Sequence, residues 1–361
     1  MQRSHRNPGA KRPLHLVRTL GAPFALLLLG LGVQASGDPS QNPSPPTALP
    51  QDTLPRPMPL GIPGGLRVAF KGLDPSIQEE LPLKAAEVAL GRALFFDPIL
   101  SREHNVACAS CHQPQHSFAD SVRFSKGAQG VTLRNAPALI NRILGQRHMW
   151  DGRAKTLEEQ VLMPLANPLE MNFSALSAAE RLNETKPWAA QFQSTFGEAP
   201  SPETIARALA AFVRALVQGD SPADRFLAGD VAALSPAEEA GMWVFDSRGK
   251  CWRCHRGANY SDDQLHTTGI GTQDGKPEPG AFAISGEAAD LGRFKTPTLR
   301  GLRHSGPFMH DGSLENLEEV VAFYRRGGNP SEALSPLMEP LELTNQDAAN
   351  LVAFLKALTP R

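Results

Sequence analysis

Two short motifs of the same form contain every cysteine of the chain. Residues 108–112 read Cys-Ala-Ser-Cys-His and residues 251–255 read Cys-Trp-Arg-Cys-His. This form is typical of c-type haem attachment, because two thiols one helical turn apart can each form a thioether with a haem vinyl group while the adjacent imidazole reaches the iron. The sequence therefore predicts two covalent haems. The attachment residues are Cys108, Cys111, Cys251 and Cys254, and the proximal iron ligands are His112 and His255.

A zinc site and a thioredoxin-like redox pair are the alternatives for paired cysteines. Zinc ribbons bring their two pairs within roughly 15 to 20 residues of each other, whereas His112 and His255 lie 143 residues apart. Neither alternative explains a histidine after both pairs. The matching settings indicate two units of one kind. The group that fills the second axial face of each iron then decides between electron transfer and peroxide or oxygen chemistry.

The composition is that of a globular chain with room for two domains. The 361 residues are 41% hydrophobic and 20% charged, which is enough apolar material to bury a sizeable core. The 36 lysine and arginine residues are balanced by 37 aspartate and glutamate residues. This balance offers no electrostatic footprint for nucleic acid, so we expect no nucleic-acid partner.

The N-terminus has the three parts of a secretory signal. Five basic residues and no acidic one occur in the first eighteen positions, and an apolar run of fourteen residues follows at 20–33. We expect a signal peptide over residues 1–35, cleavage after Ala35 and export to the periplasm. An uncleaved anchor is the alternative, although a membrane span needs roughly 20 apolar residues. Cleavage leaves 31 basic and 37 acidic residues, a formal net charge of −6.

The rest of the chain is expected to be mainly α-helical. Residues 36–72 form a Pro-rich linker, because such a segment buries too little apolar surface to fold alone. Helical periodicity predicts a helix that starts near Pro202 and stops at Gly219, and capping boxes at Ser235 and Thr344 predict helices through Phe245 and Leu358. The loop 267–292 is too long for a simple connection, and a large cofactor would give it a packing surface.

Over residues 84–358 the chain resembles the bacterial di-haem cytochrome c peroxidase and MauG superfamily. Besides the second haem motif, the matching stretches are LGRALFFDPILS (90–101), CASCHQPQHSFAD (108–120), RNAPALIN (134–141), MWDGRAKTLEEQVLMPLANPLEM (149–171) and GRFKTPTLRGLRHSGPFMHDGSLENLEEVVAFY (292–324). The resemblance implies two cytochrome c-like helical haem domains with long irregular loops. Residues 73–222 would be the N-terminal, peroxidatic domain and residues 223–361 the C-terminal, electron-transfer domain.

The resemblance implies roles for four residues around the first haem. Trp150 matches a tryptophan between the two haems, Glu170 matches a distal acid, and Gln160 and Pro164 match other positions that line that pocket. Peroxide cleavage needs a group that takes a proton from the near oxygen and returns one to the leaving oxygen, and a partly buried carboxylate can do both. The alternatives are a core aromatic for Trp150 and a solvated surface acid for Glu170.

The first haem is expected to be open on its distal face. Many peroxidase-type relatives carry a removable distal histidine in the loop after the first haem motif. Here residues 124–129 contain no histidine, and His116 follows His112 too closely to cross to the other face of the ring. We therefore expect a five-coordinate first iron that needs no reductive activation.

The second haem is expected to have a tyrosine as its distal ligand. Fourteen residues after the histidine of a PFMHDG-like segment, peroxidases of this superfamily place a methionine and MauG-like enzymes a tyrosine; counting from His310 gives Tyr324. A phenolate stabilises ferric iron and lowers its potential, whereas a thioether raises it. Tyr324 could instead be a core residue of an apolar helical stripe, with Met309 as the ligand.

A calcium ion between the haems is a further implication of the resemblance. The Asn135 side chain and the carbonyls of Ser305 and Pro307 match its ligands, and hard oxygen donors suit this ion. Asn135 could also cap a turn. His266 matches a family segment near the second haem, and we assign it no role.

The resemblance and the residues together predict a periplasmic di-haem c peroxidase of MauG type. It would reduce hydrogen peroxide at the first haem, store oxidising equivalents on both haems and oxidise a small cytochrome, a copper protein or a side chain of a partner protein. A conventional cytochrome c peroxidase, a di-haem electron carrier without peroxide chemistry and a small-molecule oxygenase are the alternatives. The chain departs from its relatives at Gly301, where an asparagine is usual, and at Gly249, where MauG has a surface tryptophan. The second departure weakens any role in maturing methylamine dehydrogenase.

Overall fold

Helices make up most of the regular structure in residues 83–361, which are the residues that the computed structural model describes. The strands found in this part of the chain form one small sheet, in which β1 (Leu265–His266) pairs antiparallel with β2 (Phe294–Lys295). The mainly α fold class is therefore confirmed. The predicted signal peptide (1–35), the Pro-rich linker (36–72) and the first ten residues of the first predicted domain lie outside the described residues.

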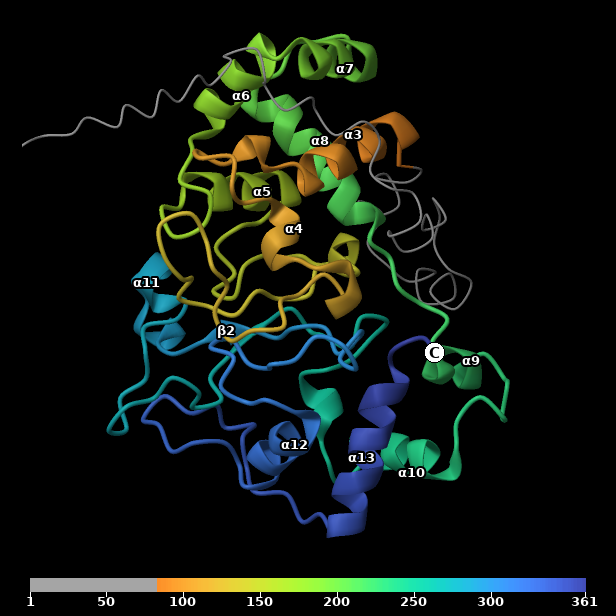
Figure 1. The fold of residues 1–361 in the computed structure, drawn as a ribbon. Helices are drawn as coiled ribbons and strands as arrows, with labels where there is room; N and C mark the ends of the chain where they lie inside the picture. Colours follow the sequence, from red (N-terminus) through yellow and green to blue (C-terminus); the bar gives the residue numbers. More distant parts are fainter. Residues whose placement is uncertain (1–82) are drawn as a thin grey trace, which may run out of the picture. The chain divides into compact units, whose positions relative to one another are not determined.

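The elements follow one another along the chain as labelled in Figure 1. The α-helices are α3 (Ala85–Phe96), α4 (Cys108–Cys111), α5 (Leu157–Ala166), α6 (Ala175–Glu184), α7 (Lys186–Phe196), α8 (Pro202–Ala215), α9 (Pro222–Leu227), α10 (Pro236–Asp246), α11 (Phe282–Ser285), α12 (Leu317–Arg325) and α13 (Asn345–Ala357). Short 3-10 helices are η1 (Pro98–Leu100), η2 (Pro114–His116), η3 (Arg142–Leu144), η4 (Cys251–Arg253) and η5 (Ala288–Asp290). Within the described part of the chain, no helix has the length and apolar character that a membrane crossing needs.

Buried apolar side chains of residues 83–361 gather in two separate clusters. The first draws on α3, α5, α6, α7 and α8, from Leu90 to Leu216. The second draws on α10, α12 and α13, from Ala223 to Leu358. Each half therefore has its own core, and the assignment of residues 73–222 and 223–361 to two haem domains stays a prediction.

Each half is held by two helices that cross at a glycine. A Cβ atom at Gly91 of α3 would lie 1.8 Å from the carbonyl oxygen of Ala208 in α8. A Cβ atom at Gly241 of α10 would lie 1.9 Å from the carbonyl oxygen of Asn350 in α13. Only glycine permits such a close approach of two backbones, so the longest helices of each half pack in the same way.

The helix predicted from Pro202 to Gly219 is shorter than expected. It begins at Pro202 with Ser201 as a capping box, but it ends at Ala215. The reason lies in Asn141, whose side chain bonds both backbone groups of Gln218, at 2.7 Å to its N–H and 2.9 Å to its carbonyl. Asn141 also donates its own N–H to the carbonyl of Leu216. The segment after Ala215 therefore leaves the helix and is hydrogen-bonded to Asn141 instead.

The other two predicted helices are confirmed to within one residue at their C-terminal ends. Ser235 and Glu238 form the expected capping box of α10, and Thr344 and Asp347 form that of α13. The loop 267–292 contains only the short helices α11 and η5. Its Pro279, Gly280 and Ala283 line a large cavity, as expected of a loop that packs against a bound group.

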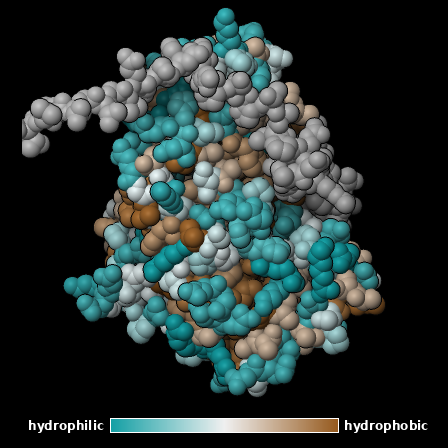
Figure 2. Space-filling view, in the orientation of Figure 1, coloured by the Kyte–Doolittle hydropathy of each residue, from teal (hydrophilic) through white to brown (hydrophobic). Residues whose placement is uncertain are grey.

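Polar residues cover much of one face of the surface, and the interior contains a buried ion pair between an arginine and an aspartate. The face drawn in Figure 2 is mostly hydrophilic, with hydrophobic residues in limited patches. In the interior, Arg300 is 2% exposed and makes two hydrogen bonds of 2.8 Å to the carboxylate of Asp224. Burial opposes ionisation of Asp224, but these bonds hold its pKa below the usual range. The ion pair therefore ties α9, which contains Asp224, to the segment of the second half that contains Arg300.

Candidate functional site

The first Cys-x-x-Cys-His motif lies on helix α4 and the residue after it. Cys108 begins α4 and Cys111 ends it, so the two thiols are one turn apart, and neither forms a disulfide. The Nδ1 atom of His112 lies 2.9 Å from the carbonyl oxygen of Phe118. A nitrogen facing a carbonyl must carry the proton, so Nε2 keeps its lone pair for a metal. Burial lowers the pKa of His112, which favours this neutral form.

The second motif repeats this arrangement. Cys251 begins the short helix η4, Cys254 follows it, and both are free thiols. The Nδ1 atom of His255 lies 2.9 Å from the carbonyl oxygen of Tyr260. Burial lowers the pKa of His255 to about 4, so this imidazole is also neutral at pH 7. Both histidines are therefore oriented and protonated as metal ligands.

One cavity of about 870 Å³ contains nearly all of the predicted site. It is lined by thirteen of the fourteen predicted residues: Cys111, His112, Asn135, Trp150, Gln160, Pro164, Glu170, Cys251, Cys254, His255, Ser305, Pro307 and Tyr324. The exception is Cys108, which packs against the first core. Of the other residues discussed from sequence, Met309 and His266 also line the cavity and His116 does not.

The residues of the cavity fit two haems c. The two thiol pairs, the two neutral imidazoles and the mainly apolar walls are what covalent haem attachment needs. A zinc site with four cysteine ligands does not fit, because each motif has its own core and its own histidine. A redox pair does not fit either, since burial raises rather than lowers the pKa of the Cys108 thiol, to about 12.

Glu170 lies on the first-haem side of the cavity, after the end of α5. Its carboxylate accepts a 2.6 Å hydrogen bond from the side-chain amide of Asn167. Burial raises the pKa of Glu170, and the Asn167 bond and the charge of Arg153 only partly offset this. A partly buried carboxyl group with a raised pKa in a cavity can both take and return a proton near neutral pH. Glu170 is therefore half-buried in the cavity and not fully solvated, and its role in proton transfer stays a prediction.

The loop 124–129, which follows the first haem motif, packs against the backbone of Glu170. Ala128 donates its N–H to the Glu170 carbonyl at 2.7 Å, and a Cβ atom at Gly127 would lie 1.8 Å from the carbonyl oxygen of Leu169. His116 is away from the cavity, and its Nδ1 faces the carbonyl of His304 at 3.1 Å. Neither the loop nor His116 therefore brings an imidazole to the distal side of the first motif.

Tyr324 and Met309 both line the cavity on the second-haem side. Tyr324 lies in the last turn of α12, and burial, together with negative charge on the Cys254 and Cys251 thiols, raises its pKa. Met309 has a left-handed backbone, with φ of 74°. Placement in the cavity does not choose between them, so tyrosine ligation stays a prediction.

An internal repeat relates the two sides of the cavity, with an offset of 160 residues between 135–164 and 295–324. The bridge between His148 and Ala154 recurs between Phe308 and Leu314, and Met149 shares the left-handed backbone of Met309. The helices α5 and α12 start at equivalent residues and are capped at equivalent positions. The repeat also explains Gly301, because its equivalent Asn141 has φ of 57° and both residue types tolerate this conformation.

The repeat makes Trp150 the counterpart of His310, and these two rings meet. Their centroids are 6.2 Å apart in an edge-to-face arrangement. The indole N–H of Trp150 donates to the carbonyl of Asn135 at 2.8 Å. His310 stacks on Phe294 with 3.6 Å between centroids, and its Nε2 faces Glu278. Trp150 thus lines the cavity where the two repeats meet, and its position between two haems stays a prediction.

The predicted calcium ligands, from both halves of the chain, all line this cavity. Asn135 donates its side-chain amide to the carbonyl of Val122 at 3.1 Å, which leaves the amide oxygen for another partner. Ser305 and Pro307 line the same cavity. Three oxygen donors of this kind suit calcium, and the ion itself stays a prediction.

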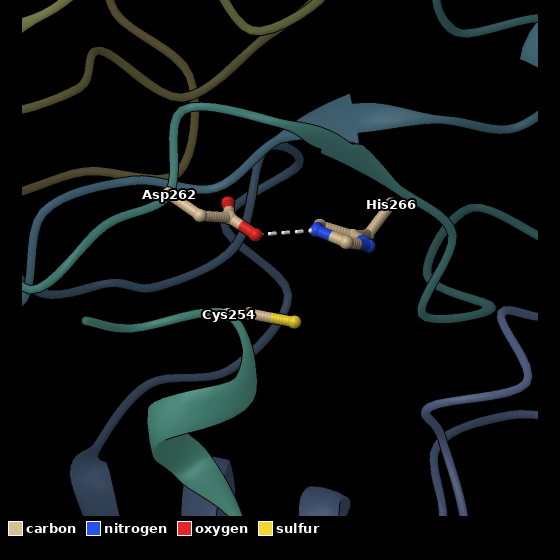
Figure 3. A group of neighbouring side chains, drawn as sticks. All are labelled: Cys254, Asp262 and His266. Carbon is tan, nitrogen blue, oxygen red and sulfur yellow. Dashed lines mark hydrogen bonds and ion pairs between the residues drawn. The ribbon is translucent and has the colours of Figure 1, made fainter.

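Cys254, Asp262 and His266 form a cluster whose possible ligand atoms lie within 4.8 Å of one another (Figure 3). The Nε2 atom of His266 faces the Asp262 carboxylate at 2.9 Å. This bond lowers the pKa of Asp262 despite its burial. Because the Cys254 sulfur is needed for haem attachment, the cluster is better explained as support of the second motif than as a separate metal site.

Several cavity residues were not predicted from the sequence. Arg142, His148 and Lys295 form a buried basic group, and Glu278 and His310 form a pair beside Trp150. None belongs to a local motif. The 160-residue repeat is the signal that could have found two of them, because it aligns Lys295 with Asn135 and His310 with Trp150.

The fold and the site define a di-haem c-type protein. The sequence profile of the di-haem cytochrome c peroxidase family matches residues 85–232. The methylamine utilization protein MauG of Methylorubrum extorquens is 40% identical over 282 residues, which cover 77% of this chain and 79% of that protein. This chain belongs to the di-haem cytochrome c peroxidase and MauG family, and it is a di-haem peroxidase with two haems c.

Other relatives agree with this membership. The cytochrome c551 peroxidase of Pseudomonas aeruginosa is 32% identical over 77% of this chain and 80% of its own length. The crystal structure of a MauG-like protein associated with microbial copper homeostasis superposes with a TM-score of 0.72 at 32% identity. That similarity covers 85% of this chain and 95% of the other.

Proposed function

We propose that this di-haem peroxidase of MauG type works in the periplasm, reduces hydrogen peroxide on the first-haem side of the cavity and oxidises a partner protein. The basic segment and apolar run of residues 1–35 support export. When bound, the two haems supply the redox chemistry. The side chains of the protein would transfer the proton, connect the first-haem and second-haem sides of the cavity and make these two sides different.

Glu170 is the proton-transfer group of this proposal. With a haem bound, the haem would supply the two electrons that break the O–O bond, and the Glu170 carboxylate would move a proton from one peroxide oxygen to the other, which would leave as water. Asn167 holds the carboxyl group in place through its 2.6 Å bond. Gln160 and Pro164 line the same part of the cavity and limit the space around peroxide.

One observation carries the assignment of roles to the two sides. The repeat places Pro164 and Tyr324 at equivalent positions of α5 and α12, and both line the cavity. Proline has no side-chain atom that can bind iron, whereas tyrosine has a hydroxyl group. The first side therefore stays open for peroxide, and the second side holds a ligand that favours oxidised iron. Trp150, at the junction, lies on the path between them.

We propose calcium at the junction and a redox protein as the partner. Asn135, with the carbonyls of Ser305 and Pro307, would hold the ion. Kinship with a cytochrome c551 peroxidase supports a small cytochrome as electron donor, and kinship with MauG supports a protein whose side chain is modified. A copper protein is the third kind of partner in this proposal.

The ferric EPR spectrum of the purified protein tests the proposal, after two haems c per chain have been confirmed. We expect one high-spin and one low-spin haem, and loss of both signals on addition of hydrogen peroxide. Two low-spin haems that do not react with peroxide would contradict an open first side. That result would favour a di-haem electron carrier.

A further inference from the structure

The two repeats bind each other through reciprocal backbone hydrogen bonds. Asn135 of the first repeat donates its N–H to the carbonyl of His310 at 2.9 Å. Lys295, its equivalent in the second repeat, donates its N–H to the carbonyl of Trp150 at 2.7 Å. The junction thus contains the same backbone contact twice, and Lys295 occupies the position that Asn135 has in the proposed calcium site.

A cation already occupies the counterpart of that site. The carbonyls of Ser305 and Pro307 correspond to those of Gly145 and Arg147. The guanidinium of Arg142 donates to the Arg147 carbonyl at 2.7 Å, and the same guanidinium nitrogen fills the space where Gly145 has no side chain. Where one half offers oxygen atoms to a metal ion, the other half binds its own arginine.

The charges of this group do not balance. Arg142 and Lys295 are 8% and 7% exposed, and they share one nearby carboxylate, Asp263, at 4.0 Å and 3.4 Å. Asp262, the acidic residue beside Asp263 in the sequence, is hydrogen-bonded to His266. A buried cation without a full counter-charge is costly, so the group is short of one anion.

The missing anion is on the cavity side. Arg142, His148 and Lys295 line the cavity, whereas Asp263 does not. Burial and the charge of Arg142 lower the pKa of His148 to about 3, so this ring is neutral and adds no charge. Burial and Arg142 also lower the pKa of Lys295, to about 7. A negative group in the cavity would keep the Lys295 ammonium protonated.

We propose that Arg142 and Lys295 form a fixed cation site that binds a carboxylate group of a haem, as the counterpart of the calcium site in the other repeat. Haem carries two propionate groups, which need cationic partners when they are buried. The proposal rests on the two haems c, and it uses the proposed calcium site only for comparison. A free carboxylate is the other source of the same chemistry.

The test uses the full chain with both haems attached. Lys295→Met removes the ammonium, Lys295→Arg keeps the charge, and Lys276→Met removes an exposed lysine as a matched control. The haem content, the propionate bending band of the resonance Raman spectrum and the reduction potential of each haem are measured in resting protein. These readouts do not depend on turnover with peroxide, so they separate this proposal from the proposed function.

We expect Lys295→Met to shift the propionate band and to lower the potential of one haem, because a nearby cation favours the reduced state. Lys295→Arg should restore both values towards those of the wild type, and Lys276→Met should change neither. Asp263→Asn removes the competing carboxylate with little change in shape, so it should raise the same potential even if Lys295→Met does not fold.

Two results would overturn the proposal. The first is a propionate band and two potentials that stay at wild-type values in both Lys295→Met and Asp263→Asn. The second is an unchanged propionate band in Lys295→Met together with a wild-type potential that depends on added acetate. That pattern would assign the site to a free carboxylate instead of a haem propionate.

Discussion

Glu170 owes its proposed role to burial in a cavity with a single hydrogen-bond donor at its carboxylate. We expect Glu170→Gln to slow the reaction with hydrogen peroxide by about 10²–10⁴-fold, because the amide cannot take a proton from peroxide. Stopped-flow absorbance after mixing with peroxide measures this rate. Both haems should stay attached, since the side chain is outside the two attachment motifs. Wild-type kinetics in this variant would remove Glu170 as the proton-transfer group.

The same residue predicts a pH dependence. Burial raises the pKa of Glu170, and the ionised form is the one that accepts a proton. The peroxide reaction should therefore be slow below this raised pKa and become faster as the pH rises through it. In Glu170→Gln this rise should disappear, while any step due to other groups should remain. A rise of the same size in the variant would assign the titration to another residue.

Tyr324 is the proposed ligand on the second-haem side of the cavity. We expect Tyr324→Met to raise the reduction potential of one haem only, because a thioether favours ferrous iron more than a phenolate does. Spectroelectrochemical titration resolves the two haems. Tyr260 is a matched control, since Tyr260→Phe removes a buried hydroxyl outside the cavity lining. An unchanged optical spectrum in Tyr324→Met would exclude the tyrosine as a ligand and favour Met309.

The residues that the sequence predicted best are those whose chemistry needs a local motif. Cysteine attachment requires a spacing of one helical turn and an adjacent histidine, so these six positions could be read directly. Arg142, Lys295 and Asp263 could not, because their contacts join segments more than 100 residues apart or depend on burial. Glu170 lies between these cases, since its position came from the family and its cavity environment from the structure.

At the scale of elements, α5 and α12 place a proline and a tyrosine at equivalent positions of one cavity. Each helix begins after a residue whose side chain caps it, Thr156 for α5 and Asn316 for α12. Pro164 and Tyr324, which lie fourteen positions after Trp150 and His310, both line the cavity. The ends of such helices follow from capping residues. The C-terminal end of α8 could not be predicted in this way, because Asn141, which lies far away in sequence, bonds the segment after the helix.

The equivalence of Pro164 and Tyr324 predicts that one substitution can close the first side. We expect Pro164→His to place an imidazole where Tyr324 stands in the other repeat, and thus to convert the high-spin haem to low spin. EPR measures this change, and the reaction with peroxide should slow with it. Pro164→Ala is the control, since it also removes the proline from the helix but adds no ligand. A high-spin signal that persists in Pro164→His would mean that the two helices present these positions differently.

At the scale of the molecule, the two halves have separate cores and line one cavity, so we expect a change at their junction to affect both. The proposed calcium ligands come from Asn135 in one half and from Ser305 and Pro307 in the other. An ion that binds only the folded protein stabilises it by about 2.7 kcal/mol when its free concentration is about 100 times its Kd. Chelation should therefore lower the Tm and disturb the EPR signals of both haems at once.

This last expectation differs from what a surface calcium site would give, because such a site would change the stability without changing the haems. Asn135→Ala should reproduce the effect of the chelator, and the chelator should have no further effect on that variant. Added calcium should restore the wild type but not Asn135→Ala. If chelation lowers the Tm of both proteins equally, the ion binds elsewhere. If it changes neither the Tm nor the spectra, the junction is held by the reciprocal hydrogen bonds of Asn135 and Lys295 without a metal ion.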